Sequence, residues 1–230
     1  MERFLLISPK EPMEILLELF HQLTDPNWIM NNGGLYLVML IIFIETGLFF
    51  GFFLPGDPLL FISGMVIASA DQSAIPFTNP LANLLFWSIL FIVATILGNV
   101  VGYWTGNRFS HIFRNKDRKS RFLKPQHISA AEDFYTRRGG FAILIARFLP
   151  IVRTFVPIVA GIVKMDKKTF MLYNISGAIL WVGVISTLGF VLGENKWVEN
   201  NLGWTMLILI VIVTAPVIIK LFKKQPTQAL

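Results

Sequence analysis

The segment at residues 43–64 carries two carboxylates, Glu45 and Asp57, in sequence that is otherwise as apolar as a membrane span. A charged side chain costs about 2.5 to 3.5 kcal/mol at the centre of a membrane helix. A segment that holds two of them needs partners for both. This requirement makes it a candidate functional region and constrains how the rest of the chain can fold.

The same segment interrupts itself with the motif Pro-Gly-Asp-Pro at residues 55–58. Proline has no amide N–H and cannot continue a helix in its interior, so backbone polar groups are left unpaired there. Such a break is tolerated at membrane depth only where protein or water covers it. We therefore predict a re-entrant hairpin of two half-helices that meet between Leu54 and Pro58, with Asp57 at the N-terminus of the returning half.

The composition and charge pattern indicate an integral membrane protein. Of 230 residues, 54% are hydrophobic and only 15% are charged, and the mean hydropathy is +0.63. The net charge of +6 comes from basic residues that cluster between and after the apolar segments. This pattern is typical of membrane orientation, because cytoplasmic loops are rich in Lys and Arg, and it argues against nucleic-acid binding. The absence of cysteine excludes disulfides and thiolate chemistry.

The alternation of apolar and polar segments predicts five parts. The first is an amphipathic, interfacial segment, the second and fourth each combine a broken hairpin with a spanning helix, the third is a basic cytoplasmic loop, and the fifth is a spanning helix with a cytoplasmic tail. The spans are expected at residues 81–105, 170–192 and 204–222. In order, the five parts are residues 1–32, 33–106, 107–138, 139–193 and 194–230.

Residues 139–163 form the second broken segment, which contains Arg147 and Arg153 and is interrupted by Pro150 and Pro157. Its Arg-Phe-Leu-Pro, followed by a glycine at position 161, echoes the Phe-Phe-Leu-Pro of the first segment, followed by a glycine at position 64. We therefore predict an all-α integral membrane protein with two opposed re-entrant hairpins and about three spanning helices, arranged as an inverted repeat. Transporters of this design place their site near the midplane of the membrane.

Opposed hairpin tips would bring two acids and two arginines together. Arginine stays protonated and offers a planar fork that suits phosphate, so Arg147 and Arg153 are the candidate phosphate-binding residues. Glu45 and Asp57 are the candidates for proton coupling or gating, because a buried carboxylate can carry a proton or alternate as a partner of arginine. The alternative is that all four are permanent counter-ions that only hold the hairpins in register.

Other polar and small residues have structural interpretations. Asn99 is expected to hydrogen-bond between helices. The histidines lie outside the predicted spans and lack metal-ligand spacing, so we expect no metal site and no cofactor. Tryptophans at segment ends, at positions 28, 197 and 204, are expected to anchor the chain at the membrane interface. The glycines of the spans are expected to be packing positions, namely Gly98, Gly102, Gly106, Gly189 and Gly193.

Two motifs resemble the DedA family of bacterial membrane proteins, which shares a domain with eukaryotic lipid scramblases. They are ETGLFFGFFLPGD at residues 45–57 and RFLPIVRTFVPIVAG at residues 147–161. The resemblance implies opposed re-entrant hairpins, the bacterial inner membrane, and movement of lipid head groups, including recycling of undecaprenyl phosphate. It implies coupling to the proton motive force in several members. It also implies that the functional residues are Glu45, Asp57, Arg147 and Arg153.

The sequence therefore predicts a multi-pass transporter, not an enzyme, that moves a phosphate-bearing lipid, with undecaprenyl phosphate as the best match. Its expected partners are the membrane, the anionic lipid and, where transport is coupled, protons. A general phospholipid scramblase, a proton-coupled exporter of cations or small drugs, and a non-catalytic scaffold stay open as alternatives. The histidine arrangements of a lipid phosphatase or a metalloprotease do not occur. The oligomeric state is left open.

Overall fold

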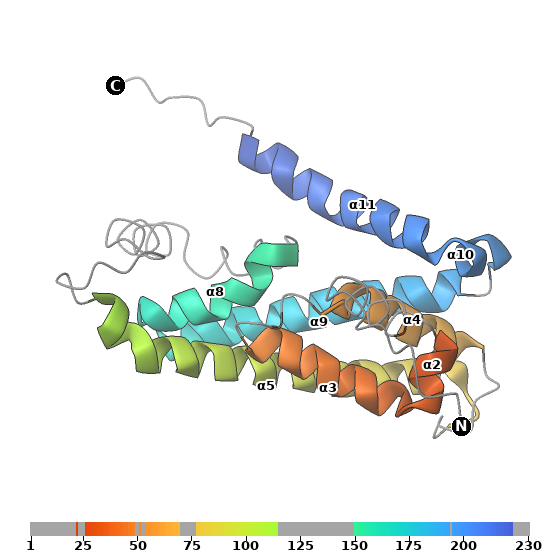
Figure 1. Ribbon diagram of the computed structural model, residues 1–230, viewed down its shortest axis with the longest axis horizontal. Coiled ribbons are helices and arrows are strands. Elements are labelled where there is room, and N and C mark those ends of the chain that lie inside the picture. The colour runs from red at the N-terminus through yellow and green to blue at the C-terminus, as the bar shows by residue number, and fades with distance from the viewer. Residues whose placement is uncertain are drawn as a thin grey trace, which may run out of the picture.

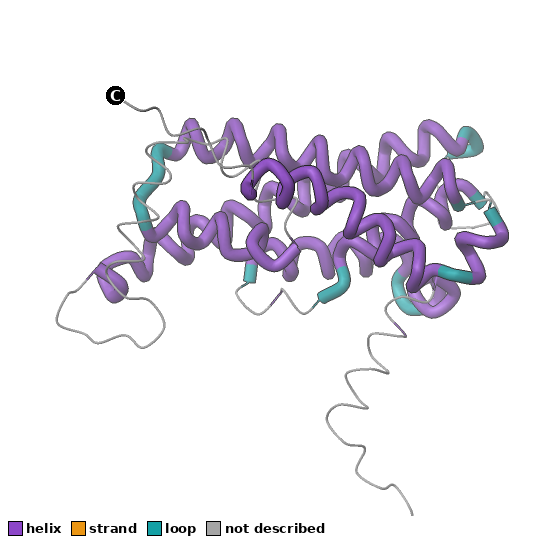
Figure 2. The backbone as a smooth tube through the Cα atoms, turned by 90° about the horizontal axis from the view of Figure 1, so that it is seen from above, coloured by secondary structure: helices purple, strands orange, loops and turns teal. Residues whose placement is uncertain are grey.

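A computed structural model describes residues 22, 26–48, 51, 54–69, 77–114, 150–193 and 195–222 of the chain. These residues are largely helical, and none of them lies in a strand, as Figure 2 also shows. The all-α prediction is thus confirmed for this part of the chain. Of the predicted amphipathic segment at residues 1–32, only residues 22 and 26–32 are described, and residues 115–138 of the predicted loop lie outside the described part. The helices are α2 (Pro26–Asn31), α3 (Gly34–Gly47), α4 (Gly56–Ala68), α5 (Pro80–Arg114), α8 (Pro150–Ile162), α9 (Lys167–Leu192), α10 (Lys196–Asn200) and α11 (Leu202–Phe222).

Two long apolar helices, α5 and α9, form the axis of the bundle and run in opposite directions (Figure 1). Residues Pro80–Ser110 of α5 and Lys167–Leu192 of α9 are each long and apolar enough to cross a membrane. Along α5, an exposed apolar stripe recurs at every fourth residue, which is the surface a lipid-facing helix presents. The stripe comprises Leu81, Leu85, Ile89, Val93 and Leu97. The third expected span forms the 21-residue α11.

The shorter helices pack along different halves of this axis. In Figure 1, α3 and α4 lie beside one half of α5 and α9, and α8 lies beside the other half. α4 packs chiefly against α9, whereas α3 and α8 pack against α5. The inner ends of α3, α4 and α8 therefore converge near the middle of the bundle.

Each group of short helices packs on the long helices through a cluster of buried apolar side chains. The larger cluster joins α3 and α4 to α5 and α9 around Trp87, Phe61 and Phe91, which are fully buried. The smaller cluster joins α8 to α5 and α9, and Tyr103 stacks on Phe170 there with ring centroids 4.5 Å apart. Polar side chains that lie between the two clusters are consequently shielded at both ends.

Glycines let α4 and α9 cross with their backbones in contact. A Cβ on Gly64 of α4 would clash with the carbonyl oxygen of Ser186, and a Cβ on Gly189 of α9 would clash with the carbonyl oxygen of Phe61. Small residues at such crossings are what helix association in a membrane uses. The predicted packing role of Gly189 is thus confirmed.

The crossing of α8 with α5 repeats this arrangement. A Cβ on Gly161 of α8 would clash with the carbonyl oxygen of Tyr103, and a Cβ on Gly106 of α5 would clash with the carbonyl oxygen of Ile158. In each crossing, the carbonyl on the short helix belongs to the residue three positions before its glycine. The two short helices therefore use the same packing register against the two long ones.

The breaks in the helices differ from the prediction in two places. α3 ends at Gly47, where Leu48 takes an extended conformation, so the gap before α4 is longer than the predicted junction between Leu54 and Pro58. Pro58 is the third residue of α4, where a helix needs no amide donor, so it does not break the chain. Pro157 lies inside α8 rather than interrupting it.

The ends of α5 and α9 also differ from the expected spans. α5 continues to Arg114, so residues 107–114 of the predicted loop are helical. α9 begins three residues before the predicted span, because Asp166 caps it by accepting a hydrogen bond of 2.9 Å from the Thr169 amide. This bond also holds the pKa of the exposed Asp166 carboxyl below its usual value.

Replacing Gly189 by alanine is expected to lower thermal stability, because the added Cβ would force α4 and α9 apart, and overpacking costs about 1 to 3 kcal/mol. Gly183→Ala is the matched control in the same helix, since a Cβ there meets nothing within 4 Å. That variant should be neutral or stabilising by up to about 1 kcal/mol. Melting of the purified variants in detergent measures both, and equal melting temperatures would contradict the packing.

Candidate functional site

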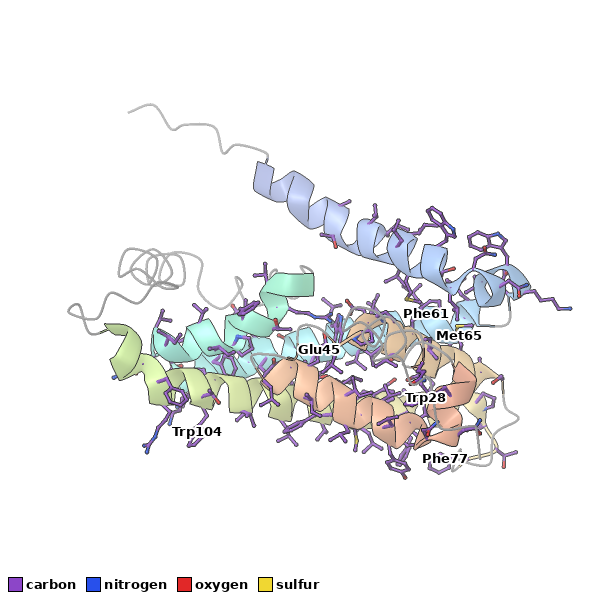
Figure 3. All side chains as sticks on the ribbon, viewed as in Figure 1. Trp28, Glu45, Phe61, Met65, Phe77 and Trp104 are labelled. Atoms are coloured by element: carbon purple, nitrogen blue, oxygen red, sulfur yellow. The ribbon has the colours of Figure 1, made fainter. Side chains whose placement is uncertain are left out.

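Three charged side chains meet where the short helices converge. Glu45 lies near the C-terminal end of α3, Asp57 is the second residue of α4, and Arg153 is in the first turn of α8. A carboxylate in the first turn of a helix is stabilised by the helix dipole, which favours Asp57 at its position. Figure 3 places Glu45 between the ends of the bundle, with Phe77 toward one end and Trp104 toward the other.

Arg153 bridges the two acids. Its Nη2 donates to Glu45 Oε1 and its Nη1 donates to Asp57 Oδ1, both at 2.5 Å. The exposed fraction of the side chain is 8% for Arg153, 3% for Glu45 and 13% for Asp57. Charge-assisted bonds of this kind offset the cost of removing three charges from water, and among the described residues of the cluster two carboxylates face one arginine.

Trp181 of α9 completes the cluster. Its indole Nε1 donates to Asp57 Oδ1 at 2.8 Å, and the Arg153 guanidinium carbon lies 4.6 Å from the centre of its ring. The indole therefore contacts the aspartate by a hydrogen bond and the arginine by a cation–π interaction. Sequence reasoning missed this residue. The sequence feature that could have found it is its position in the middle of an expected span, because a tryptophan that anchors a protein at the membrane interface lies near the end of a span.

Gly56 makes room for the Glu45 carboxylate. A Cβ at this position would overlap Glu45 Oε2, so only glycine lets the start of α4 approach the acid this closely. Oε2 is buried and has no hydrogen-bond partner among the described residues. In the sequence, Gly56 is recognisable only as part of the Pro-Gly-Asp-Pro helix break.

The cluster lies near the middle of both long helices. The end of α3 contacts α5 at Gly98, where a Cβ on Gly47 would lie 3.0 Å from the Gly98 carbonyl oxygen. Gly98 and Trp181 each lie near the centre of their own candidate span. The charges therefore lie near the middle of both candidate spans, where a charge costs most in a helix that crosses a membrane.

Of the four predicted site residues, the structure brings three together, namely Glu45, Asp57 and Arg153. Arg147 lies outside the described residues. The roles of phosphate binding and proton coupling stay predictions. Asn99 does bond between helices, because its Nδ2 donates to Asn174 Oδ1 at 2.8 Å.

The described part of the cluster is held together by ionic hydrogen bonds. In the described part of the chain, no group of three His, Cys, Asp or Glu side chains could hold a metal ion. An arginine paired with two carboxylates can exchange one of them for another oxyanion while keeping its N–H donors paired. Fold and site together define a helical membrane protein with a buried ionic cluster at mid-depth.

Comparison with known proteins identifies the family. The VTT domain model matches residues 38–191. Protein DedA of Escherichia coli (strain K12) is 36% identical over 194 residues, which cover 84% of both chains. The inner membrane protein YqjA of the same strain is 30% identical over 233 residues, covering 93% of this chain and 98% of YqjA. An uncharacterized membrane protein of Mycobacterium leprae (strain TN) is 32% identical over 197 residues, covering 84% of this chain and 83% of that protein.

The chain belongs to the VTT-domain family of DedA-like membrane proteins. The family resemblance predicted from residues 45–57 and 147–161 is thus confirmed. No solved structure matches the chain.

Arg153→Met is expected to destabilise the protein by about 3 to 5 kcal/mol, because it leaves two buried carboxylates without a cation. Adding Glu45→Gln and Asp57→Asn removes those charges and should recover most of the loss. Thermal melting of the single and triple variants measures the effect. If the triple variant is no more stable than Arg153→Met, the ionic cluster does not account for the cost.

Proposed function

We propose that this protein is a transporter that moves a lipid with a phosphate head group across the bilayer. The observation that carries the proposal is Arg153, bound by two carboxylates at the junction of three short helices and at mid-depth between two spanning helices. Arg153 has two acid partners among the described residues, so it keeps one of them when the other is exchanged. A second acid supplies an exchangeable partner, which a site that binds and releases an anion requires.

Glu45 is the partner that phosphate would displace. Asp57 is held by the Trp181 indole as well as by Arg153, whereas Glu45 Oε2 has no hydrogen-bond partner among the described residues. Phosphate oxygens match the planar guanidinium fork that Glu45 Oε1 now occupies in part. Arg153 would thus keep Asp57 and exchange Glu45 for substrate, and Arg147 would add a second cation to the site.

The proposed route is alternating access across an inverted repeat. α3 with α4, and α8 with the preceding segment, would be re-entrant hairpins that enter from opposite faces. The matched glycine crossings of α4 with α9 and of α8 with α5 support this symmetry. Each hairpin would open the cluster to one face in turn, while the apolar tail of the lipid stays in the membrane.

The proposed substrate is undecaprenyl phosphate, and the proposed location is the inner membrane of a bacterium, with several membrane passes. The name of the relative YqjA supports that location. The reaction is translocation, not bond cleavage, so the protein is not an enzyme in this proposal. Displaced Glu45 would take up a proton, because an unpaired charge in an apolar interior is costly, and this step would couple transport to the proton motive force.

Arg153→Ala should reduce translocation of an undecaprenyl phosphate analogue in proteoliposomes by about 30-fold or more, since truncating a buried charge pair costs roughly 2 to 5 kcal/mol. Arg108→Ala, at an exposed arginine of α5, is the matched control and should keep the wild-type rate. Equal rates for wild type and Arg153→Ala would refute the proposal, as would a wild type that moves no phosphate lipid.

Glu45→Gln should remove the dependence of transport on a pH gradient, because glutamine keeps the shape of the side chain but cannot exchange a proton. The measurement is the ratio of rates with and without an imposed gradient. Wild type should respond to the gradient and the variant should not. An unchanged ratio in the variant would assign proton coupling to another residue.

A further inference from the structure

A small cavity with a mainly apolar lining and several polar side chains adjoins the ionic cluster between α3, α5, α8 and α9. It is lined by Thr46, Thr95, Asn99, Arg153, Val156, Pro157, Phe170, Asn174 and Trp181. The proposed transport step uses only Arg153 and Trp181 of this set. The other polar side chains of the set, Thr46, Thr95, Asn99 and Asn174, all make hydrogen bonds within the protein.

Arg153 brings an unused hydrogen-bond donor to this cavity. Its two Nη groups bind the carboxylates, but its Nε is buried and has no partner among the described residues. Pro157, which also lines the cavity, has no amide and cannot donate to the Arg153 carbonyl one helical turn earlier. The Arg153 side chain therefore brings one buried donor that has no partner among the described residues.

The threonines supply the matching acceptors. Thr46 Oγ1 donates to the Ile42 carbonyl and Thr95 Oγ1 donates to the Phe91 carbonyl, both at 2.8 Å. With the hydroxyl hydrogens so committed, the lone pairs of the two oxygens can accept. The pair Asn99–Asn174 closes the other side with its 2.8 Å bond.

The volume of the cavity limits the size of the molecule that it can bind. It is about 20 Å³, and roughly 10 to 15 Å³ of such space suffices for one water molecule when two to four polar partners surround it. A phosphate group, with four oxygens around phosphorus, does not fit.

We propose that this cavity binds one water molecule, which accepts a hydrogen bond from Arg153 Nε and donates to the polar atoms that line the cavity, Thr95 Oγ1 among them. The water fixes the third nitrogen of the guanidinium, so that both Nη groups stay directed at the carboxylate side when one carboxylate is exchanged. Thr95 is then a positioning residue for Arg153. This second part rests on the proposed lipid transport, whereas the water site does not.

X-ray hydroxyl-radical footprinting tests the water directly, because radicals formed from a bound water label the buried side chains beside it. Phe170 lines the cavity and is 3% exposed, and Phe91 does not line it and is 0% exposed. In the wild-type protein, Phe170 should label faster than Phe91. Equal labelling rates would overturn the proposal without any variant.

Thr95→Val removes the acceptor while keeping the shape of the side chain, and it should lower labelling of Phe170 to the level of Phe91. The matched control is Thr205→Val, because Thr205 is also buried and donates to a carbonyl four residues earlier, but lies on α11 and away from the cavity. Unchanged Phe170 labelling in Thr95→Val would contradict the role of this hydroxyl in holding the water.

The role of Thr95 in positioning Arg153 is tested by a separate measurement. Thr95→Val should raise the apparent KM for the phosphate lipid about two- to tenfold, the value of one hydrogen bond, with little change in maximal rate. Thr205→Val should change neither. An unchanged KM would overturn the positioning role. If wild type moves no phosphate lipid, the proposed function fails, and the Phe170 labelling still decides whether the water is bound.

Discussion

One arginine bound to two carboxylates at the centre of an apolar bundle is the interaction on which this structure depends. Burying three charges is tolerated only where each finds a partner with good geometry, and loss of the arginine would leave two acids uncompensated. The pairing is also long-range, since Arg153 is separated from Glu45 by 108 residues and from Asp57 by 96 residues along the chain. The cluster therefore ties the two halves of the protein together at the point where its short helices end.

Backbone packing makes this pairing reachable. The glycines at the crossings of α4 with α9 and of α8 with α5 remove the side chains that would hold the helices apart. Gly56 does the same for the Glu45 carboxylate at the start of α4. The same register in both crossings brings the inner ends of α4 and α8 to a common centre. Small residues thus set the distances at which the charged residues bind.

The sequence predicted the site residues more accurately than it predicted where the helices break. Glu45, Asp57 and Arg153 are conspicuous because charged residues are rare in apolar sequence. Their opposite charges predicted that they would pair. Helix breaks were harder to place, because proline acts by its position: Pro58 is harmless in a first turn, while Pro157 is tolerated inside a packed helix. Trp181 escaped prediction because its role depends on a contact 124 residues away in the chain, with Asp57.

The proposed transport mechanism requires that phosphate displaces Glu45 from Arg153. Infrared difference spectroscopy on adding a phosphate lipid to the purified protein tests it most directly, because a displaced, buried carboxylate becomes a carboxylic acid with its own carbonyl band. This band should appear in the wild-type protein and in Asp57→Asn, and it should be missing in Glu45→Gln. A spectrum without the band, or a band that persists in Glu45→Gln, would contradict it.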